Sequence, residues 1–368
     1  MMASDAVAGR PAVSVIVPAR NEEDCLGVCL GSLVAQAGVG FEVVAVDDGS
    51  TDRTREIAES FAGVQVVDAG PLPAGWSGKN HALTAGVRQA KGEWLLFTDA
   101  DTVHLPGSLA QAMAEAKKQG AALLSYSPEQ EVHGFWERAV MPVIFAELAG
   151  RYRPAEVSDP SSPIAAANGQ YLLISREAYE AVGGHAAIAE DLLEDVALAR
   201  RVKQLGRKIF FRYGGDAVRT RMYRSFGQLR EGWTKNLALL FPSAGSLALL
   251  RLWEFGLMVG SALLTVVYGF GGRDRAAIVP GVVCVVLVSL FMLRIRRAHF
   301  SWNSDVLAMM GLPMFSYLLL RSRTFHRKGR VNWKGREYST GQAGPSTARH
   351  RSAIDEASLG MTEVGKRV

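Results

Sequence analysis

Cysteine is scarce in this chain, which has three cysteines among 368 residues. Cys25, Cys29 and Cys284 are an odd number without metal-ligand spacing, which excludes a small disulfide-stapled scaffold. We expect these thiols to be reduced and the soluble part of the chain to face the cytosol. The histidines also lack metal spacing, and we expect structural roles for three of them: His81, His104 and His185.

Before Asn236 the sequence has no apolar run as long as a membrane span. The first run, residues 13–17, is far too short for a signal peptide or a transmembrane helix, so we expect the N-terminus to stay in the cytosol. Residues 1–11 are small and polar, and we expect them to be disordered. No internal repeat is visible.

The excess of basic residues is confined to one segment. The formal net charge is +5, but residues 294–337 hold ten Lys and Arg against two acids, so the rest of the chain is net negative. This basic segment adjoins the most apolar stretches. Anionic lipid headgroups, and not nucleic acid, are therefore the expected partner.

Short strand and helix patterns alternate through the first 212 residues. This alternation predicts an α/β fold with a parallel, doubly wound sheet. Strands are predicted at 13–18, 41–46, 64–67, 121–125, 171–174 and 208–212, besides one that begins at Trp94. Helices are predicted at 23–36, 80–89, 106–119, 177–182 and 194–205, besides one that ends at Phe61. Residues 135–148 are apolar and fit either a core helix or a helix lying on a bilayer surface.

A short apolar run from Trp94 ends in two carboxylates, Asp99 and Asp101. Residues i and i+2 of an extended chain face the same side, so both side chains can reach one hard divalent cation. Taken alone, an Asp-x-Asp sequence fits an acidic turn better than a metal site. Its place at the carboxyl end of a strand, where open α/β sheets bind ligands, favours a functional site.

Other polar groups are predicted at the same edge of the sheet. They are the segment 18–22, the pair Asp47-Asp48, Lys79 in a glycine-containing loop, and the pair Glu194-Asp195 that opens a helix. A diphosphate needs a cation and basic donors, a nucleoside needs a carboxylate, and a glycosyl acceptor needs a general base. The chain offers a candidate for each task, although Asp47 fits a turn cap as well as a ligand.

Four motifs occur in order: S-V-I-V-P-A-R-N-E, V-D-D-G-S-T-D-R-T, T-D-A-D and L-E-D. Together they resemble the family 2 inverting glycosyltransferases over residues 12–236, which implies a nucleotide-binding sheet of the GT-A type with flanking helices. Further motifs, W-S-G-K-N-H-A, M-Y-R-S-F, G-W-T-K-N and W-K-G-R-E-Y, are similar to a bacterial membrane-bound branch. That branch glycosylates isoprenoid lipids and includes hopanoid-associated enzymes and glycosyltransferases of carotenoid acids.

The resemblance implies a nucleotide-sugar donor, in particular a UDP-sugar. Asp48 would bind the nucleoside and Lys79 would meet the diphosphate. A Mg²⁺ or Mn²⁺ ion would be held by Asp101 and by Asp99, unless Asp99 instead holds the ribose. Three further positions would lie beside the nucleoside: Pro18, Ala19 and Glu22.

The resemblance also implies an acceptor side. Asp195, next to Glu194, would be the general base that deprotonates the acceptor, and inversion requires no covalent nucleophile. Trp233 falls where processive synthases carry the tryptophan of a Gln-x-x-Arg-Trp motif at the acceptor site. The arginine before that tryptophan is missing here, which leaves Arg230 and Lys235 as substitutes.

Two long apolar segments, near 252–270 and 276–294, are predicted to form a membrane hairpin. A third, 305–320, is shorter. If it crossed the membrane, the basic stretch 321–336 would lie opposite the soluble domain, against the positive-inside rule. We therefore expect a re-entrant or interfacial segment within a membrane region at 237–337, followed by a disordered tail at 338–368.

These expectations describe a multi-pass protein of the cell membrane that transfers one sugar with inversion to a lipid at the cytosolic face. Two alternatives are a processive polysaccharide synthase and a catalytically silent membrane interaction protein. Two clear spans are few for a polymer channel, and intact acids at every cluster argue against a silent protein.

Overall fold

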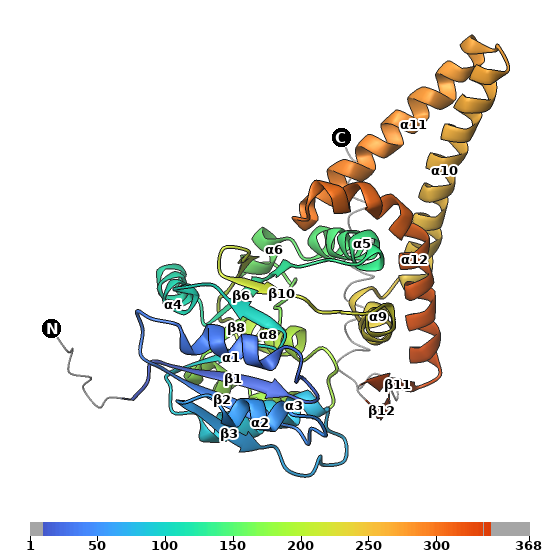
Figure 1. The fold of residues 1–368 in the computed structure, drawn as a ribbon. Coiled ribbons are helices and arrows are strands. Elements are labelled where there is room, and N and C mark those ends of the chain that lie inside the picture. The colour runs from blue at the N-terminus through green and yellow to red at the C-terminus, as the bar shows by residue number, and fades with distance from the viewer. Residues whose placement is uncertain (1–9, 334, 340–368) are drawn as a thin grey trace.

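The computed structural model describes residues 10–333 and 335–339. The disorder predicted for the two ends of the chain falls mainly on residues outside this part. Figure 1 shows an α/β domain from which a long helical hairpin extends, and the last two strands lie beside the far end of the final helix.

Seven strands form the main sheet, in the order β3-β2-β1-β4-β8-β6-β9. Their bounds are β1 Val13–Ala19, β2 Phe41–Asp47, β3 Val64–Asp68, β4 Trp94–Phe97, β6 Leu123–Ser127, β8 Leu172–Ser175 and β9 Ile209–Tyr213. The valine- and leucine-rich strands in the middle of the sheet are buried on both faces, as expected where helices cover a sheet on both sides.

One strand corrects the prediction of a parallel sheet. β8 runs antiparallel to both of its neighbours, β4 and β6, whereas the other pairs in this sheet are parallel. An antiparallel strand begins at the edge where its neighbours end. The residues just before β8, Gly169 and Gln170, therefore lie at the carboxyl edge of the sheet beside the end of β4, where the Thr98 hydroxyl donates to the Gln170 carbonyl at 2.7 Å.

Helices cover both faces of this sheet within a few residues of the predicted positions. On one face pack α3 (Gly78–Gln89), α7 (Arg176–Ala181) and α8 (Glu194–Gln204), and on the other α1 (Leu26–Val34), α2 (Thr54–Glu59) and α4 (Ser108–Gln119). Asp52 accepts from the backbone N–H of Thr54 at 3.0 Å at the start of α2, and Asp47 accepts from that of Ser50 at 3.1 Å. Both carboxylates stabilise the turn after β2.

Two smaller sheets were not predicted. One has three strands in the order β5-β10-β7, with bounds Thr102–His104, Val218–Thr220 and Glu129–Gln130. The other is an antiparallel hairpin of β11 (Arg330–Trp333) and β12 (Arg336–Ser339). The three-stranded sheet holds the chain that leaves Asp101, because β5 starts at the next residue.

Two hydrophobic cores lie on the two faces of the main sheet. A third core forms among the later helices, α5 (Phe135–Arg151), α9 (Phe226–Leu240) and α12 (Trp302–Arg327). Val140, Val143 and Ile144 of α5 are fully buried, which fits the core-helix alternative for this stretch. The remaining elements are α6 (Pro154–Ser158), the 3₁₀ turns η1 (His185–Ile188) and η2 (Arg296–Ala298), α10 (Ala244–Phe270) and α11 (Asp274–Ile295).

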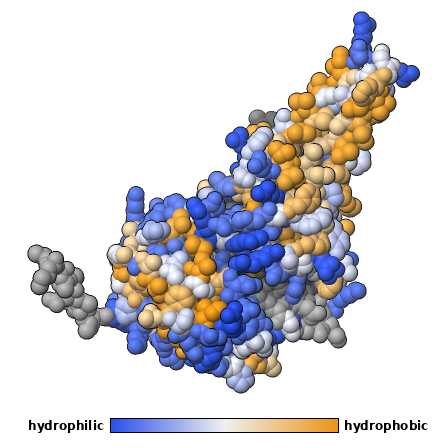
Figure 2. All heavy atoms as spheres, in the orientation of Figure 1, coloured by the Kyte–Doolittle hydropathy of each residue, from blue (hydrophilic) through white to orange (hydrophobic). Residues whose placement is uncertain are grey.

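Three helices in the described part of the chain are long and apolar enough to cross a membrane: α10, α11 with η2, and α12. The most apolar stretch of each helix is buried inside the protein to a different extent. The buried share is 17% for α10, 6% for α11 with η2, and 50% for α12. Figure 2 shows the α10–α11 hairpin as a mostly hydrophobic surface with hydrophilic atoms at its tip. α12 instead lies against α5, α9 and α10.

The contact of α12 with α5 depends on a glycine. A Cβ atom on Gly311 would overlap the carbonyl oxygen of Ala139, so the two helix backbones touch at this point. Only glycine permits that approach.

Four charged side chains join the hairpin to α5. Arg251 of α10 donates to Glu147 of α5 at 3.1 Å and to Glu254 at 2.8 Å, and Arg294 of α11 donates to Glu254 at 2.9 Å. Their side chains are between 10% and 21% exposed, and the two positive charges balance the two negative ones. Because partly buried charges must remain paired, this network fixes the base of the hairpin to the α/β domain.

Candidate active site

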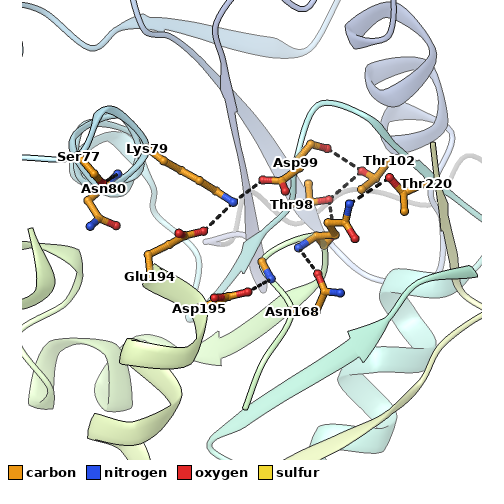
Figure 3. A network of polar contacts seen from close by, with 12 residues as sticks. Ser77, Lys79, Asn80, Thr98, Asp99, Thr102, Asn168, Glu194, Asp195 and Thr220 are labelled. Atoms are coloured by element: carbon orange, nitrogen blue, oxygen red, sulfur yellow. Dashed lines mark hydrogen bonds and ion pairs between the residues drawn. The ribbon is translucent and has the colours of Figure 1, made fainter. Parts of the chain in front are cut away.

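Lys79 is held between two carboxylates at the carboxyl edge of the main sheet. Its Nζ atom lies 2.6 Å from Oδ1 of Asp99, just after β4, and 2.6 Å from Oε1 of Glu194, the first residue of α8 (Figure 3). Burial lowers the pKa of Lys79, but the charges of the two acids outweigh it and raise the pKa well above its ordinary value. Lys79 is therefore a fixed positive charge.

Asn80 positions this lysine. Ser77 caps α3 by accepting from the Asn80 backbone N–H at 3.2 Å. The Asn80 side-chain amide donates to three carbonyls of the segment before α8, those of Ile188 at 2.7 Å, Ala189 at 3.1 Å and Asp191 at 3.0 Å. These bonds tie the start of α3 to the segment that carries Glu194. Asn80 was not predicted as a site residue, although it stands in the W-S-G-K-N-H-A motif.

Asp195 lies beside this ion-paired group and is held by backbone donors. Its Oδ2 accepts from the N–H of Gly169 at 2.9 Å, and its Oδ1 from that of Val196 at 2.7 Å. Burial and then the negative charge of Glu194 raise the pKa of Asp195 to about 6. A carboxylate with such a pKa is a suitable general base near neutral pH.

Glu194 has the opposite shift. Burial alone would raise its pKa, but the positive charges of Lys79 and then Lys235 lower it. The adjacent acids thus have pKa values that are pushed apart, which is the pattern of one group that stays charged and another that exchanges a proton. From the sequence, Lys235 was only a candidate substitute for the missing arginine of the Gln-x-x-Arg-Trp motif. In the structure it lies on α9, and its positive charge lowers the pKa of Glu194.

The turn that carries Asp99 and Asp101 is fixed by hydroxyl groups. Thr98 and Thr102 lie 2.9 Å apart between their hydroxyls, and the Thr220 hydroxyl donates to the main-chain oxygen of Asp101 at 3.2 Å. His104 contacts Thr98 at 3.0 Å, and burial lowers its pKa to about 3, so it is neutral. This neutral state agrees with the structural role expected for His104.

Asp48 lies at the end of β2, next to the segment that follows β1. Its backbone N–H donates to the Ala19 carbonyl at 2.9 Å, and Pro18 pairs in register with Val46. Glu22 follows in the same loop, where its backbone N–H donates to Thr54 at 2.7 Å. The predicted nucleoside residues are therefore neighbours, and the Asp48 carboxylate forms an ion pair with Arg336 of the C-terminal hairpin.

The structure does not bring Trp233 and Arg230 to the carboxylates. The Trp233 side chain is 2% exposed in the third core, where its indole N–H donates to the sulfur of Met141 at 3.3 Å. Arg230 is exposed, with its guanidinium 5.9 Å from the ring of Phe226. Their place in an acceptor site stays a prediction.

Comparison with known proteins shows the family to which this chain is related. A profile of glycosyl transferase family 2 matches residues 14–183. The 4,4'-diaponeurosporenoate glycosyltransferase of Staphylococcus aureus is 31% identical over 339 residues, which cover 89% of this chain and 88% of that protein. The chain belongs to glycosyl transferase family 2. The family predicted from the four motifs is thereby confirmed, as is the resemblance to enzymes of carotenoid acids.

A solved structure supports the fold of the transferase. A mannosyltransferase from Pyrobaculum calidifontis, in complex with GDP-Man and Mn²⁺, superposes with a TM-score of 0.53 at 19% identity, covering 86% of this chain and 87% of that one. At this identity the similarity concerns the fold alone. The predicted GT-A type sheet followed by apolar helices is confirmed.

Proposed function

We propose that the transferase moves a sugar, with inversion, from a nucleotide-sugar donor to a lipid acceptor of the isoprenoid type. The observation that carries this proposal is the group formed by Lys79, Asp99 and Glu194, with Asp195 beside it. It combines a fixed cation for a diphosphate, one carboxylate, Asp99, of the pair that would hold a metal, and a base with a raised pKa. We take a UDP-sugar as the donor, with its nucleoside bound at Asp48.

The reaction is a single in-line displacement. The acceptor oxygen forms a bond to the anomeric carbon as the bond from that carbon to the diphosphate oxygen breaks. When the acceptor is a hydroxyl group, Asp195 takes its proton, and the two backbone hydrogen bonds of Asp195 orient the carboxylate for this step. Lys79 stabilises the negative charge that develops on the departing diphosphate.

A divalent cation fits the acids of this site. Among the described residues no three His, Cys, Asp or Glu side chains gather as a metal site. Mg²⁺ and Mn²⁺ are commonly held by one or two carboxylates together with substrate phosphates, however, so Asp99 and Asp101 suffice when a diphosphate is present. Asp99 already has a cationic partner, the Lys79 ammonium. The ion would supply positive charge to the leaving diphosphate.

Asp101→Ala is expected to remove the metal dependence of nucleotide binding. Titration of wild type with UDP should show an affinity about tenfold or more higher with Mn²⁺ than with a chelator, because the ion joins the carboxylate to the diphosphate. The variant should show no such difference. Asp68→Asn, at an exposed acid paired with Arg55, is the control and should behave as wild type. An unchanged Mn²⁺ effect in Asp101→Ala contradicts the assignment.

The lipid acceptor is inferred from the relative and from the helices. The Staphylococcus aureus protein is named for the apolar acid diaponeurosporenoate, and the α10–α11 hairpin of this chain is apolar enough for a bilayer. The 27 residues of α10 extend over roughly 40 Å, enough to cross a hydrocarbon core of about 30 Å. We place the transferase in the cell membrane with its α/β domain in the cytosol.

In the proposed topology α12 does not cross the membrane, and the burial of half of its most apolar part against protein supports this placement. We expect Arg273→Cys, at the hairpin tip, to react with a membrane-impermeant maleimide on intact cells. Lys328→Cys, just after α12, should react only after lysis. The unsubstituted chain provides the background. Labelling of Lys328→Cys on intact cells would contradict the two-span arrangement.

A further inference from the structure

Arg336 holds the carboxylate that the proposed function assigns to the nucleoside. Its guanidinium donates to both carboxylate oxygens of Asp48, with Nη2 at 3.2 Å from Oδ1, and also to the Asp48 main-chain oxygen at 3.4 Å. The Asp48 side chain is 7% exposed and that of Arg336 21%. A bidentate, partly buried guanidinium–carboxylate pair is among the strong polar contacts in proteins.

The hairpin that carries Arg336 lies along the rim of the site. β11 packs against α9 and α12. Near the end of α12, His326 contacts the main-chain oxygen of Lys235 at 2.8 Å, and the Lys235 charge acts on Glu194. The chain from His326 to Arg336 thus runs from the Lys235 side of the site to Asp48. Figure 1 shows this hairpin on the side toward which the β1 arrow points, where the ligand-binding ends of the strands lie.

The Arg336 guanidinium and a bound nucleoside compete for the same carboxylate. The guanidinium engages both oxygens of Asp48, so a nucleoside that takes this carboxylate with its own N–H or hydroxyl groups displaces the arginine. A donor also brings a diphosphate, and arginine binds phosphate oxygens with the same planar fork that it offers a carboxylate. An exchange of partners leaves neither Asp48 nor Arg336 as an unpaired buried charge.

We propose that Arg336 is a donor-binding residue. It pairs with Asp48 while the site holds no donor, and it binds the donor diphosphate once the nucleoside occupies Asp48. The β11–β12 hairpin thereby stays over the donor and covers it. This inference rests on the proposed function, which places the nucleoside at Asp48.

Binding of UDP and of uridine to Arg336→Gln tests the inference, with Arg327→Gln at an exposed position of α12 as the control. We expect Arg336→Gln to weaken UDP binding by about tenfold or more, since a charge-assisted contact to the diphosphate is lost. Uridine lacks the diphosphate, so its affinity should stay equal or rise. Equal or tighter binding of UDP to the variant would show that Arg336 merely blocks the pocket, and would overturn the proposal.

Hydrogen exchange of the wild-type chain gives a second readout that needs no variant. UDP should slow the exchange of backbone amides in 330–333 and 336–339, because the hairpin gains a ligand contact. Faster exchange with UDP means that the hairpin is expelled, and the proposal fails.

Asp48→Asn separates this inference from the proposed function. If the variant binds uridine as wild type does, or if wild type binds no UDP, the nucleoside site itself is wrong. If Asp48→Asn weakens uridine binding while Arg336→Gln leaves UDP binding unchanged, only the role of Arg336 is wrong.

Discussion

Asp195→Asn is expected to lower the rate of sugar transfer to a hydroxyl acceptor by roughly a thousandfold, in line with the loss of a general base. The amide keeps the shape of the side chain and an oxygen that can accept from the Gly169 N–H, but it takes up no proton. The Kd for UDP should change by less than about threefold, since the charge partners of Lys79 remain. Steady-state kinetics and UDP titration measure the two effects.

The pH dependence provides an independent check of the same residue. Only the deprotonated carboxylate accepts a proton, and its pKa is raised to about 6. The wild-type rate should therefore be full above this pH and fall as the pH drops through it, whereas the residual rate of Asp195→Asn should lack this acid limb. Glu190→Gln, which changes an acid in the segment before α8, should keep both the rate and the limb. A full rate in Asp195→Asn with a hydroxyl lipid would contradict the assignment.

The same variant distinguishes acceptor classes. A carboxylic acid is already ionised at neutral pH and needs no base, whereas a hydroxyl group does. Asp195→Asn should therefore keep much of its rate with a carotenoid acid and lose it with an isoprenoid alcohol. Comparing the two acceptors identifies the chemistry for which Asp195 is used.

Gly311→Ala is expected to lower the free energy of unfolding by about 2 to 3 kcal/mol, the cost of overpacking a close helix contact. Alanine normally stabilises a helix interior relative to glycine by up to about 1 kcal/mol. The sign is reversed here because the added methyl group overlaps the Ala139 carbonyl. Thermal unfolding in detergent measures the change.

Gly256→Ala is the matched control for this glycine. It lies in α10, and a Cβ atom there meets nothing within 4 Å. This variant should be as stable as wild type or slightly more so. Equal stability of Gly311→Ala would show that α12 does not rest on α5 as the structure has it.

Local patterns predicted most of the α/β domain and of the candidate site. Strand and helix periodicities are local, and so is the rule that places acids such as Asp99 at the carboxyl end of a strand. The direction of β8 was not predictable in this way, because a buried apolar strand reads the same in either direction. The role of Asn80 was missed because its amide binds carbonyls more than a hundred residues away.

The pair of Asp48 and Arg336 was missed for a related reason. The two residues are 288 positions apart, and nothing in either local sequence indicates the other. The W-K-G-R-E-Y motif marked Arg336 as part of a resemblance but gave it no partner. Contacts of this kind depend on how α12 returns to the domain, which Gly311 governs through packing and not through periodicity.

Under the proposed function, the charge network of Glu147, Arg251, Glu254 and Arg294 has a consequence for the choice of lipid acceptor. It joins the hairpin to α5 without a flexible linker. If the hairpin is inserted in a bilayer, the distance between the membrane surface and Asp195 is therefore fixed. A lipid reacts if its polar end spans that distance, and each methylene that must leave the bilayer costs about 0.8 kcal/mol. Selection among lipids would then follow the reach of the headgroup as well as its chemistry.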